Sequence, residues 1–262
     1  MDQLPTSRVS QSLVFESTGV DYAGPVQLKF FQGRSTRCYT GWIAVFVCFS
    51  TSAIHLEAVS DYTAEGFLKA FRKFTSHRGI CKTLFSDYGT NFKGADVILK
   101  QLLTGALNES SYLQQILTSD GTQWIFNPLG ALHMGGKWEA AVKSVKHHLQ
   151  CTIADLLLVY KDFSTFLTQV KALLNSRQLS ALTDDPDDIS ALTPGHFIRG
   201  APLNTVLEPS LTSVPTSRLS LYKRIQERLQ YFWERWSAEC LQSHQSISKW
   251  HTSHHGIKMF FL

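Results

Sequence analysis

The chain has 262 residues, of which 44% are hydrophobic and 18% are charged, and its formal net charge at pH 7 is +4. This composition argues against a disordered or fibrous protein, and it permits a polyanionic partner without requiring one. The length is enough for one domain of about 150–200 residues with an appendage.

Cysteine usage and the apolar runs indicate a soluble intracellular protein. The five cysteines are odd in number, far apart and without a Cys-x-x-Cys pair, which argues against a disulfide framework or a zinc knuckle and favours a reducing compartment. The first twelve residues lack the apolar core of a signal peptide, and no run approaches the ~18 apolar residues of a membrane span. We therefore expect a protein that is not secreted and has no membrane partner.

Three apolar runs predict an antiparallel meander behind a polar lead-in at residues 1–12. The first run, 15–31, is rich in β-branched and aromatic residues, and Gly24-Pro25 should kink or bulge it. The second, Cys38–Ser50, is almost continuously apolar, which is typical of a strand covered on both faces. The third, Ala53–Val59, alternates in the manner of a half-buried strand.

Two polar side chains interrupt this meander. Asp21 lies inside the first run, and because an unpaired buried carboxylate is costly, it must be exposed at a cleft, hydrogen-bonded or metal-bound. The alternation of the third run places His55, together with Glu57 and Val59, on the exposed face. We expect His55 to be a satisfied surface side chain rather than a metal ligand.

A helix and a short strand follow. Thr63 is the predicted N-cap of a helix that Gly79 ends. The strand Thr83–Phe85 then leads to Asp87 and a glycine-containing turn. Side chains at the carboxyl ends of strands line the ligand crevice of open α/β sheets, although an Asp-x-Gly turn is also common without a function.

The middle of the chain contains less regular sequence. We expect a short helix at 95–103, a polar excursion at 104–121, a strand at Thr122–Asn127 that Pro128 stops, and a loop at 129–136.

The helix after this loop carries Glu139, Lys143 and Lys146 at i, i+4 and i+7, on one stripe. Taken alone, this stripe favours a solvated helix whose Glu139 lies near the positive end of the helix dipole and pairs with Lys143.

The C-terminal third predicts two more helices. An amphipathic helix has apolar residues at core spacing (Phe163, Phe166, Leu167, Val170, Leu173, Leu174).

A proline-rich arm at 179–217 includes the acidic run TDDPDD, which favours a solvated turn over a cation site. The last helix, Leu219–Trp236, would pack on the core, on a partner protomer or against phosphates. The histidines of the tail at 251–262 do not complete a zinc set.

Three acids stand out: Asp21 inside a strand, Asp87 at the end of one, and Glu139 at the start of a helix. If they converge, their repulsion raises at least one pKa unless divalent cations neutralise them. Two Mg²⁺ ions about 3.5–4 Å apart, held by such acids, suit an in-line displacement at a phosphodiester. Hard oxygen ligands favour Mg²⁺ or Mn²⁺ over zinc.

Six blocks of the sequence resemble the integrase core of retroviruses and LTR retrotransposons, most closely the BEL/Pao group. The blocks are TGVDYAGP (18–25), SDYGTNFKG (86–94), HMGGKWEAAVKSVKHHL (133–149), LLNSRQL (173–179), DDPDDISALTPGHFIRG (184–200) and FWERW (232–236). They occur in order and cover roughly residues 5–250. Any one block alone would be a weak signal, whereas six in order are specific.

The resemblance implies an RNase H-like α/β fold, with a five-stranded mixed sheet flanked by helices. It further implies a core at 13–178, the irregular arm at 179–217, a helical extension at 218–250 and a frayed tail at 251–262. By position in the blocks, Asp21, Asp87 and Glu139 would be the catalytic, metal-binding triad. Lys143 and Lys146 would contact the element's DNA end, and Asn91 would position target DNA or brace its loop.

The sequence departs from the family pattern in three ways. Tyr88 stands where the family usually has Asn, so an aromatic ring would either alter the loop beside Asp87 or point outward. The spacing from Asp87 to Glu139 is longer than in retroviral integrases, and the excursion at 104–121 accounts for the difference. The zinc module that precedes the core in full-length integrases is absent from this sequence, as is the region expected beyond Trp250.

The leading interpretation is a Mg²⁺- or Mn²⁺-dependent integrase core that processes the 3′ ends of retrotransposon DNA and joins them to target DNA in the nucleus. The resemblance favours a homo-oligomer. An inactive transposon-derived fragment that only binds nucleic acid is the main alternative. A nuclease of RNase H type acting on RNA–DNA hybrids is a third.

Overall fold

The computed structural model describes residues 12–33, 37–109, 122–126, 137–153, 157–183, 190–203, 208–211, 214–215 and 219–244, apart from some side chains near helix ends. The strands are β1 (Ser17–Lys29), β2 (Cys38–Cys48), β3 (Ile54–Val59), β4 (Thr83–Ser86), β5 (Gln123–Phe126), β6 (Leu158–Val159), β7 (Ser180–Ala181) and β8 (Ala191–Leu192). The helices are α2 (Ala64–Arg78), α3 (Thr90–Glu109), α6 (Lys137–Ile153), α7 (Tyr160–Asn175), α8 (Pro194–Arg199) and α9 (Leu221–His244).

The main sheet has the strand order β3-β2-β1-β4-β5, with the two-residue β6 paired to the far end of β1. The first three strands form the expected antiparallel meander, whereas β4 runs parallel to β1 and β5 parallel to β4. A mixed five-stranded sheet in this order, flanked by helices, is the RNase H-like fold, so the predicted fold class is confirmed.

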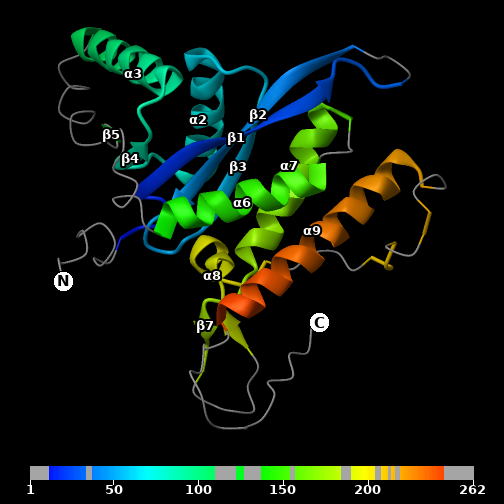
Figure 1. Cartoon of the computed structure of the whole chain (residues 1–262). Coiled ribbons are helices and arrows are strands. Elements are labelled where there is room, and N and C mark those ends of the chain that lie inside the picture. Colours follow the sequence, from blue (N-terminus) through cyan, green and yellow to red (C-terminus); the bar gives the residue numbers. More distant parts are fainter. Residues whose placement is uncertain are drawn as a thin grey trace.

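Helices cover both faces of this sheet (Figure 1), and the sheet separates the core into two apolar layers. One layer joins β1, β2 and β3 to α6, α7 and α9, and its largest buried side chains include Phe163, Phe166 and Phe232. The other joins the opposite face to α2 and the start of α3 through stacked aromatic rings such as Phe46 and Phe74. Among the described residues, no helix is long and apolar enough to span a membrane.

Two local predictions, a bulge inside β1 and the two ends of α2, are confirmed. The β1–β2 register shifts between Ala23 and Val26, so Gly24-Pro25 forms the expected bulge. The Thr63 hydroxyl accepts a hydrogen bond from the Gly66 amide at the start of α2, and Gly79, with a φ of 86°, ends that helix.

The expected exposure of His55, Glu57 and Val59 is wrong. All three side chains are buried, because helices cover β3 on both faces although it is an edge strand. Ile54, Leu56 and Ala58 face the layer that contains α7, while the opposite face of β3 lies under α2.

Two helices are longer than the sequence pattern predicts. Helix α3 begins at Thr90 and continues to Glu109, beyond the predicted range of 95–103 and into the predicted excursion. Helix α9 extends to His244 and packs on α6 and α7, so the described structure places its apolar side on the core. Its Tyr222 is an exception and is exposed.

The arm after α7 contains regular elements, the β7–β8 pair and the short helix α8. The acidic run at 184–188, most of the excursion, the loop at 129–136 and the histidine-containing tail lie outside the described residues.

Asn175 connects the end of α7 to the edge strand β3. Its Oδ1 accepts a hydrogen bond from the Ile54 amide at 2.8 Å, and its Nδ2 donates to the Ile54 carbonyl at 2.7 Å. Asn175→Ala leaves two buried backbone groups without partners, so we expect the free energy of unfolding to fall by about 2–4 kcal/mol. Urea denaturation measures this change, and Thr168→Ala on the exposed side of α7 is the control, with a change within about 0.5 kcal/mol. A loss in Asn175→Ala no larger than in the control would contradict the assignment.

Candidate active site

The parallel pairing of β1 with β4 brings Asp21 and Asp87 together. The last paired residues are Gly19 and Phe85, and two further residues along each chain lead to Asp21 and Asp87. Neighbouring strands lie about 4.7–4.9 Å apart, and residues level with each other in a parallel pair point to the same face. Asp21 and Asp87 therefore lie near each other where the strands end their pairing, close enough for the charge of Asp21 to act on the Asp87 carboxyl.

Asp21 has two hydrogen-bond donors. Lys146 on α6 places its Nζ 2.6 Å from Oδ2, and the backbone amide of Tyr22 donates to Oδ1 at 2.7 Å. About a quarter of the Asp21 side chain is exposed, so this ion pair is reachable from solvent. Of the three states expected for Asp21, the structure shows a hydrogen-bonded, partly exposed carboxylate.

Asp87 lies in a less favourable electrostatic environment. Burial raises the pKa of its carboxyl, and the negative charge of Asp21 raises it further. The Gly89 amide, which donates to Oδ1 at 3.2 Å, and the Lys146 ammonium lower it in part. The repulsion expected between neighbouring acids therefore contributes to the raised pKa of Asp87.

The loop after Asp87 is compact and internally bonded. Ser86 donates to the Asp87 carbonyl at 2.9 Å and accepts a hydrogen bond from Trp124 Nε1 at 2.9 Å, which joins β4 to β5. A Cβ on Gly89 would lie 2.6 Å from Asn91 Oδ1, so a larger residue here would have to displace the Asn91 side chain. Asn91 is buried, and its amide interacts with the hydroxyl of Tyr22, which is also buried.

Glu139 belongs to the first turn of α6, and its side chain lies outside the described part of the structure. The helix is fixed against β1 by Val142, Val145 and Leu149 in the core. Lys143 is exposed, whereas Lys146, one turn further, reaches Asp21. Lys146 therefore lies on the side of α6 that faces Asp21.

Helix α9 supports α6 from the side away from the sheet. Glu239 accepts a hydrogen bond from the Ser144 hydroxyl at 3.1 Å and makes a very short contact with His148 Nε2. His148 is buried, with its ring edge toward Phe232. Packing on the core was one of three alternatives that the sequence left open for this helix, and the polar contact with Glu239 had no signal in the sequence.

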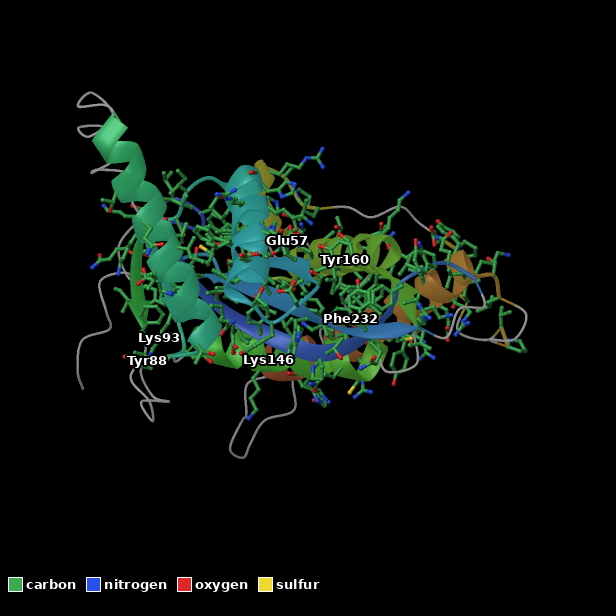
Figure 2. All side chains as sticks on the ribbon, turned by 90° about the horizontal axis from the view of Figure 1, so that it is seen from above. Glu57, Tyr88, Lys93, Lys146, Tyr160 and Phe232 are labelled. Atoms are coloured by element: carbon green, nitrogen blue, oxygen red, sulfur yellow. The ribbon has the colours of Figure 1, made fainter. Side chains whose placement is uncertain are left out.

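Two aromatic residues and one lysine lie close to the acids. Tyr88 is exposed, and Lys93 Nζ lies 3.4 Å from its ring centroid (Figure 2). Partial burial and the charges of Asp87 and Asp21 raise the pKa of Tyr62, so its phenol lies within the field of both carboxylates. Lys93 and Tyr62 were not predicted, because a single lysine or tyrosine in a loop or first helical turn has no distinguishing pattern.

The acidic pair fits a hard divalent cation. Carboxylate oxygens are the ligands that Mg²⁺ and Mn²⁺ prefer, and the Lys146 ammonium already places a positive charge against Asp21. Burial and the charge of Asp21 keep the pKa of Asp87 raised although Lys146 lowers it, so this one lysine does not fully compensate the pair.

A second group of possible metal ligands lies under α2. Nitrogen and oxygen atoms of His55, Glu57 and His77 are within 4.8 Å of one another. Arg78 Nε donates to His55 Nδ1 at 3.4 Å, so Nε2 carries the proton and donates to Glu57 at 2.9 Å. A metal would require that nitrogen unprotonated, and Lys73 Nζ already lies 3.9 Å from Glu57. This group fits a buried ion-pair network better than a metal site.

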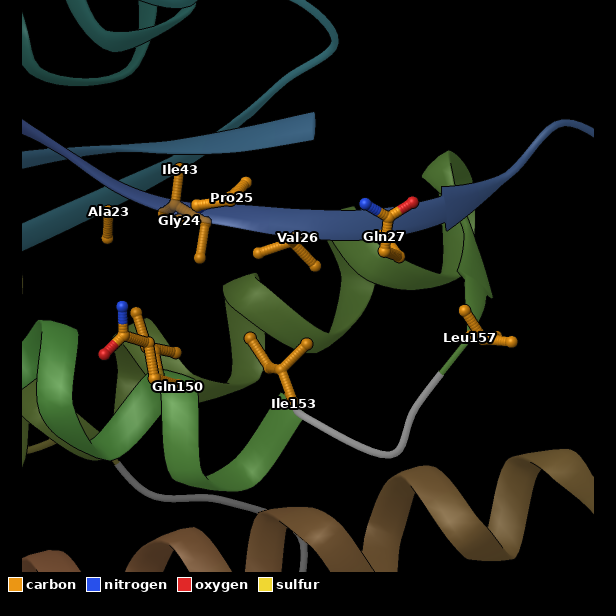
Figure 3. Close-up of a pocket in the computed structure, with 10 residues that line it drawn as sticks. Ala23, Gly24, Pro25, Val26, Gln27, Ile43, Gln150, Ile153 and Leu157 are labelled. Atoms are coloured by element: carbon orange, nitrogen blue, oxygen red, sulfur yellow. The ribbon is translucent and has the colours of Figure 1, made fainter. Parts of the chain in front are cut away.

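A cavity of about 240 Å³ lies between the β1 bulge and the end of α6 (Figure 3). Its lining is mainly apolar, with Pro25, Ile43 and Ile153 among the residues, and Gln27 and Gln150 add amides. None of the acidic site residues lines it.

Comparisons with known proteins give two partial matches. Residues 220–260 match the model described as "Family of unknown function (DUF5641)", a range that includes α9. A chain of the cryo-EM structure of a simian T-cell lymphotropic virus intasome in complex with the PP2A regulatory subunit B56 gamma is 12% identical, with a TM-score of 0.41. That match covers 82% of this chain and 66% of the other. No curated protein matches.

The buried network predicts acid sensitivity. Burial lowers the pKa of His55 from 6.5 to about 4, so His55 stabilises the fold above pH 6.5 and this contribution is lost as the pH falls toward 4. We expect the free energy of unfolding to fall by up to roughly 3 kcal/mol across this range. Urea titrations at several pH values measure it. His55→Phe should flatten the dependence.

His77→Gln is the matched control, because His77 is largely exposed, and it should keep the wild-type pH dependence. Added Zn²⁺ should not raise the unfolding midpoint. A zinc-dependent stabilisation that His77→Gln abolishes would identify a metal site instead.

Proposed function

We propose that this chain is an integrase-like polynucleotidyl transferase core that processes DNA 3′ ends and joins them to target DNA. The observation that carries the proposal is the proximity of Asp21, within β1, to Asp87, which directly follows the parallel neighbouring strand β4 of an RNase H-like sheet. Helix α6, which contains Glu139, packs against β1 beside them. The six sequence blocks support a BEL/Pao retrotransposon origin and a nuclear site of action.

In this proposal Asp21, Asp87 and Glu139 hold two Mg²⁺ or Mn²⁺ ions. Such ions supply activation of the attacking oxygen and stabilisation of the leaving oxygen in an in-line displacement. Water is the nucleophile in end processing, and the DNA 3′-hydroxyl is the nucleophile in strand transfer. Asn91 braces the loop that positions Asp87, since its buried amide oxygen packs closely against Gly89.

Lys146 has two roles in succession. Without DNA its ammonium neutralises Asp21, and with DNA it is close enough to the acidic pair to contact the phosphate next to the reacting bond. Lys143, exposed one turn earlier, contacts the DNA backbone further along. Active integration further requires element ends and target DNA to be held together, which a homo-oligomer would provide.

Catalysis is tested with labelled duplex oligonucleotides and Mn²⁺ or Mg²⁺. Asp21→Asn and Asp87→Asn should each reduce nicking and joining to background, because each removes one negative charge from the cation-binding pair. Asp96→Asn is the matched control, since Asp96 pairs with Lys100 on α3 at 2.7 Å, and its activity should equal that of the wild type. Wild-type activity in Asp87→Asn would refute the assignment.

An inactive DNA-binding fragment is the second candidate, because Lys146 already neutralises Asp21. Salt-sensitive DNA binding by a wild-type protein that neither nicks nor joins would favour this candidate. Cleavage confined to RNA–DNA hybrids would favour the nuclease alternative.

The lysine stripe makes a separate prediction about binding. In EDTA, Lys143→Ala should weaken binding of duplex DNA and reduce the salt slope of log K by about one, since one phosphate contact is lost. Asp21→Asn should strengthen binding, because it releases Lys146. Fluorescence anisotropy across a salt series measures both, with exposed Lys161→Ala on α7 as the control. Equal slopes in Lys143→Ala and the control would contradict the DNA-contact role.

A further inference from the structure

We propose that Tyr88 and Lys93 form a binding site for an unpaired nucleotide beside the acidic pair, with the base stacked on the Tyr88 ring and its phosphate near the Lys93 ammonium. The inference rests on the proposed function and deepens it, because it names the form of DNA end that the site accepts. The sequence resemblance assigns no such role, since Tyr88 departs from the family pattern.

The Tyr88 ring is exposed directly beside a candidate catalytic residue. It follows Asp87 in the chain, and 46% of the residue surface is accessible. Lys93, in the first turns of α3, places its Nζ 3.4 Å from the ring centroid. Figure 2 shows Tyr88 and Lys93 next to each other, on the same side of the molecule as Lys146.

Neighbouring groups hold the ring in place. Phe126 meets it edge-to-face at a centroid distance of 5.9 Å, and Phe126 itself stacks on Trp124 at 5.5 Å. The backbone on either side is also fixed, because the Gly89 amide donates to Asp87 and the Lys93 amide donates to the Gly89 carbonyl at 3.0 Å. A ring ordered in advance loses little conformational entropy when a ligand stacks on it.

The chemistry of this pair fits a nucleotide better than an apolar partner. An aromatic face stacks on any base, while an adjacent ammonium attracts the phosphate. Bases inside a duplex already stack on their neighbours, so only an unpaired or frayed base is free to occupy the ring. The site would therefore favour DNA ends with unpaired nucleotides next to the reacting bond.

The test uses the full chain in EDTA, so that no chemistry occurs. The probes are a blunt duplex and the same duplex with a three-nucleotide 5′ extension that carries 2-aminopurine at each position in turn. We expect wild-type protein and Tyr88→Phe to quench 2-aminopurine at one position. Tyr88→Ala should remove the quenching and weaken binding of the extended duplex roughly tenfold, with less than a twofold change for the blunt duplex.

Two further variants separate the contributions. Lys93→Ala should reduce the salt slope for the extended duplex by about one, because it removes a phosphate contact. Tyr222→Ala is the matched control, since Tyr222 is an exposed tyrosine on α9, and it should behave as wild type. Circular dichroism and the thermal midpoint verify that each variant is folded.

The outcomes distinguish this inference from the proposed function. If wild-type protein nicks and joins DNA with Mn²⁺ but Tyr88→Ala quenches and binds as wild type does, the nucleotide site is refuted and the catalytic proposal stands. If quenching depends on Tyr88 but no variant or condition gives nicking, the nucleotide site stands and the catalytic proposal fails. Absence of quenching at every position in wild-type protein also refutes the nucleotide site.

Discussion

The parallel pairing of β1 with β4 is the constraint on which the candidate site depends. Because the pairing ends at Gly19 and Phe85, two aspartates far apart in the chain become neighbours at the point where the strands separate. Two adjacent carboxylates repel each other, and the raised pKa of Asp87 reflects that repulsion together with burial. The central position of β1 leaves little freedom to relieve it by movement, so compensation has to come from cations.

Helix α6 supplies the only described side-chain cation that contacts the pair, and its position depends on elements from the end of the chain. Its apolar face packs on β1 and β2, while α9 holds its other side through Glu239. The C-terminal helix therefore acts as structural support for the site. Residues 220–260, which match a family of unknown function, include this support.

The chain contains two carboxylate clusters with different surroundings. Glu57 is buried between helices and compensated by His55, Lys73 and Lys171, so its pKa is lowered although burial alone would raise it. Asp21 and Asp87 share one lysine and remain open to solvent at the strand ends. This difference distinguishes a buried network whose charges are already balanced from an acidic site that added cations can still stabilise.

The amino-acid sequence by itself determined the antiparallel meander, the strand before Asp87, the ends of α2 and the positions of the acids along the chain, because these follow from local periodicity and from residue chemistry. The mixed five-stranded sheet was expected only from the resemblance to integrase cores. It mispredicted His55 and Glu57, since alternation within β3 does not reveal that two helices cover both faces of an edge strand. Only the tertiary structure decided that Lys146 pairs with Asp21, that Lys93 lies over Tyr88 and that Glu239 holds α6. These contacts join residues on different elements or successive helical turns, and their geometry depends on how the elements pack rather than on any pattern along the chain.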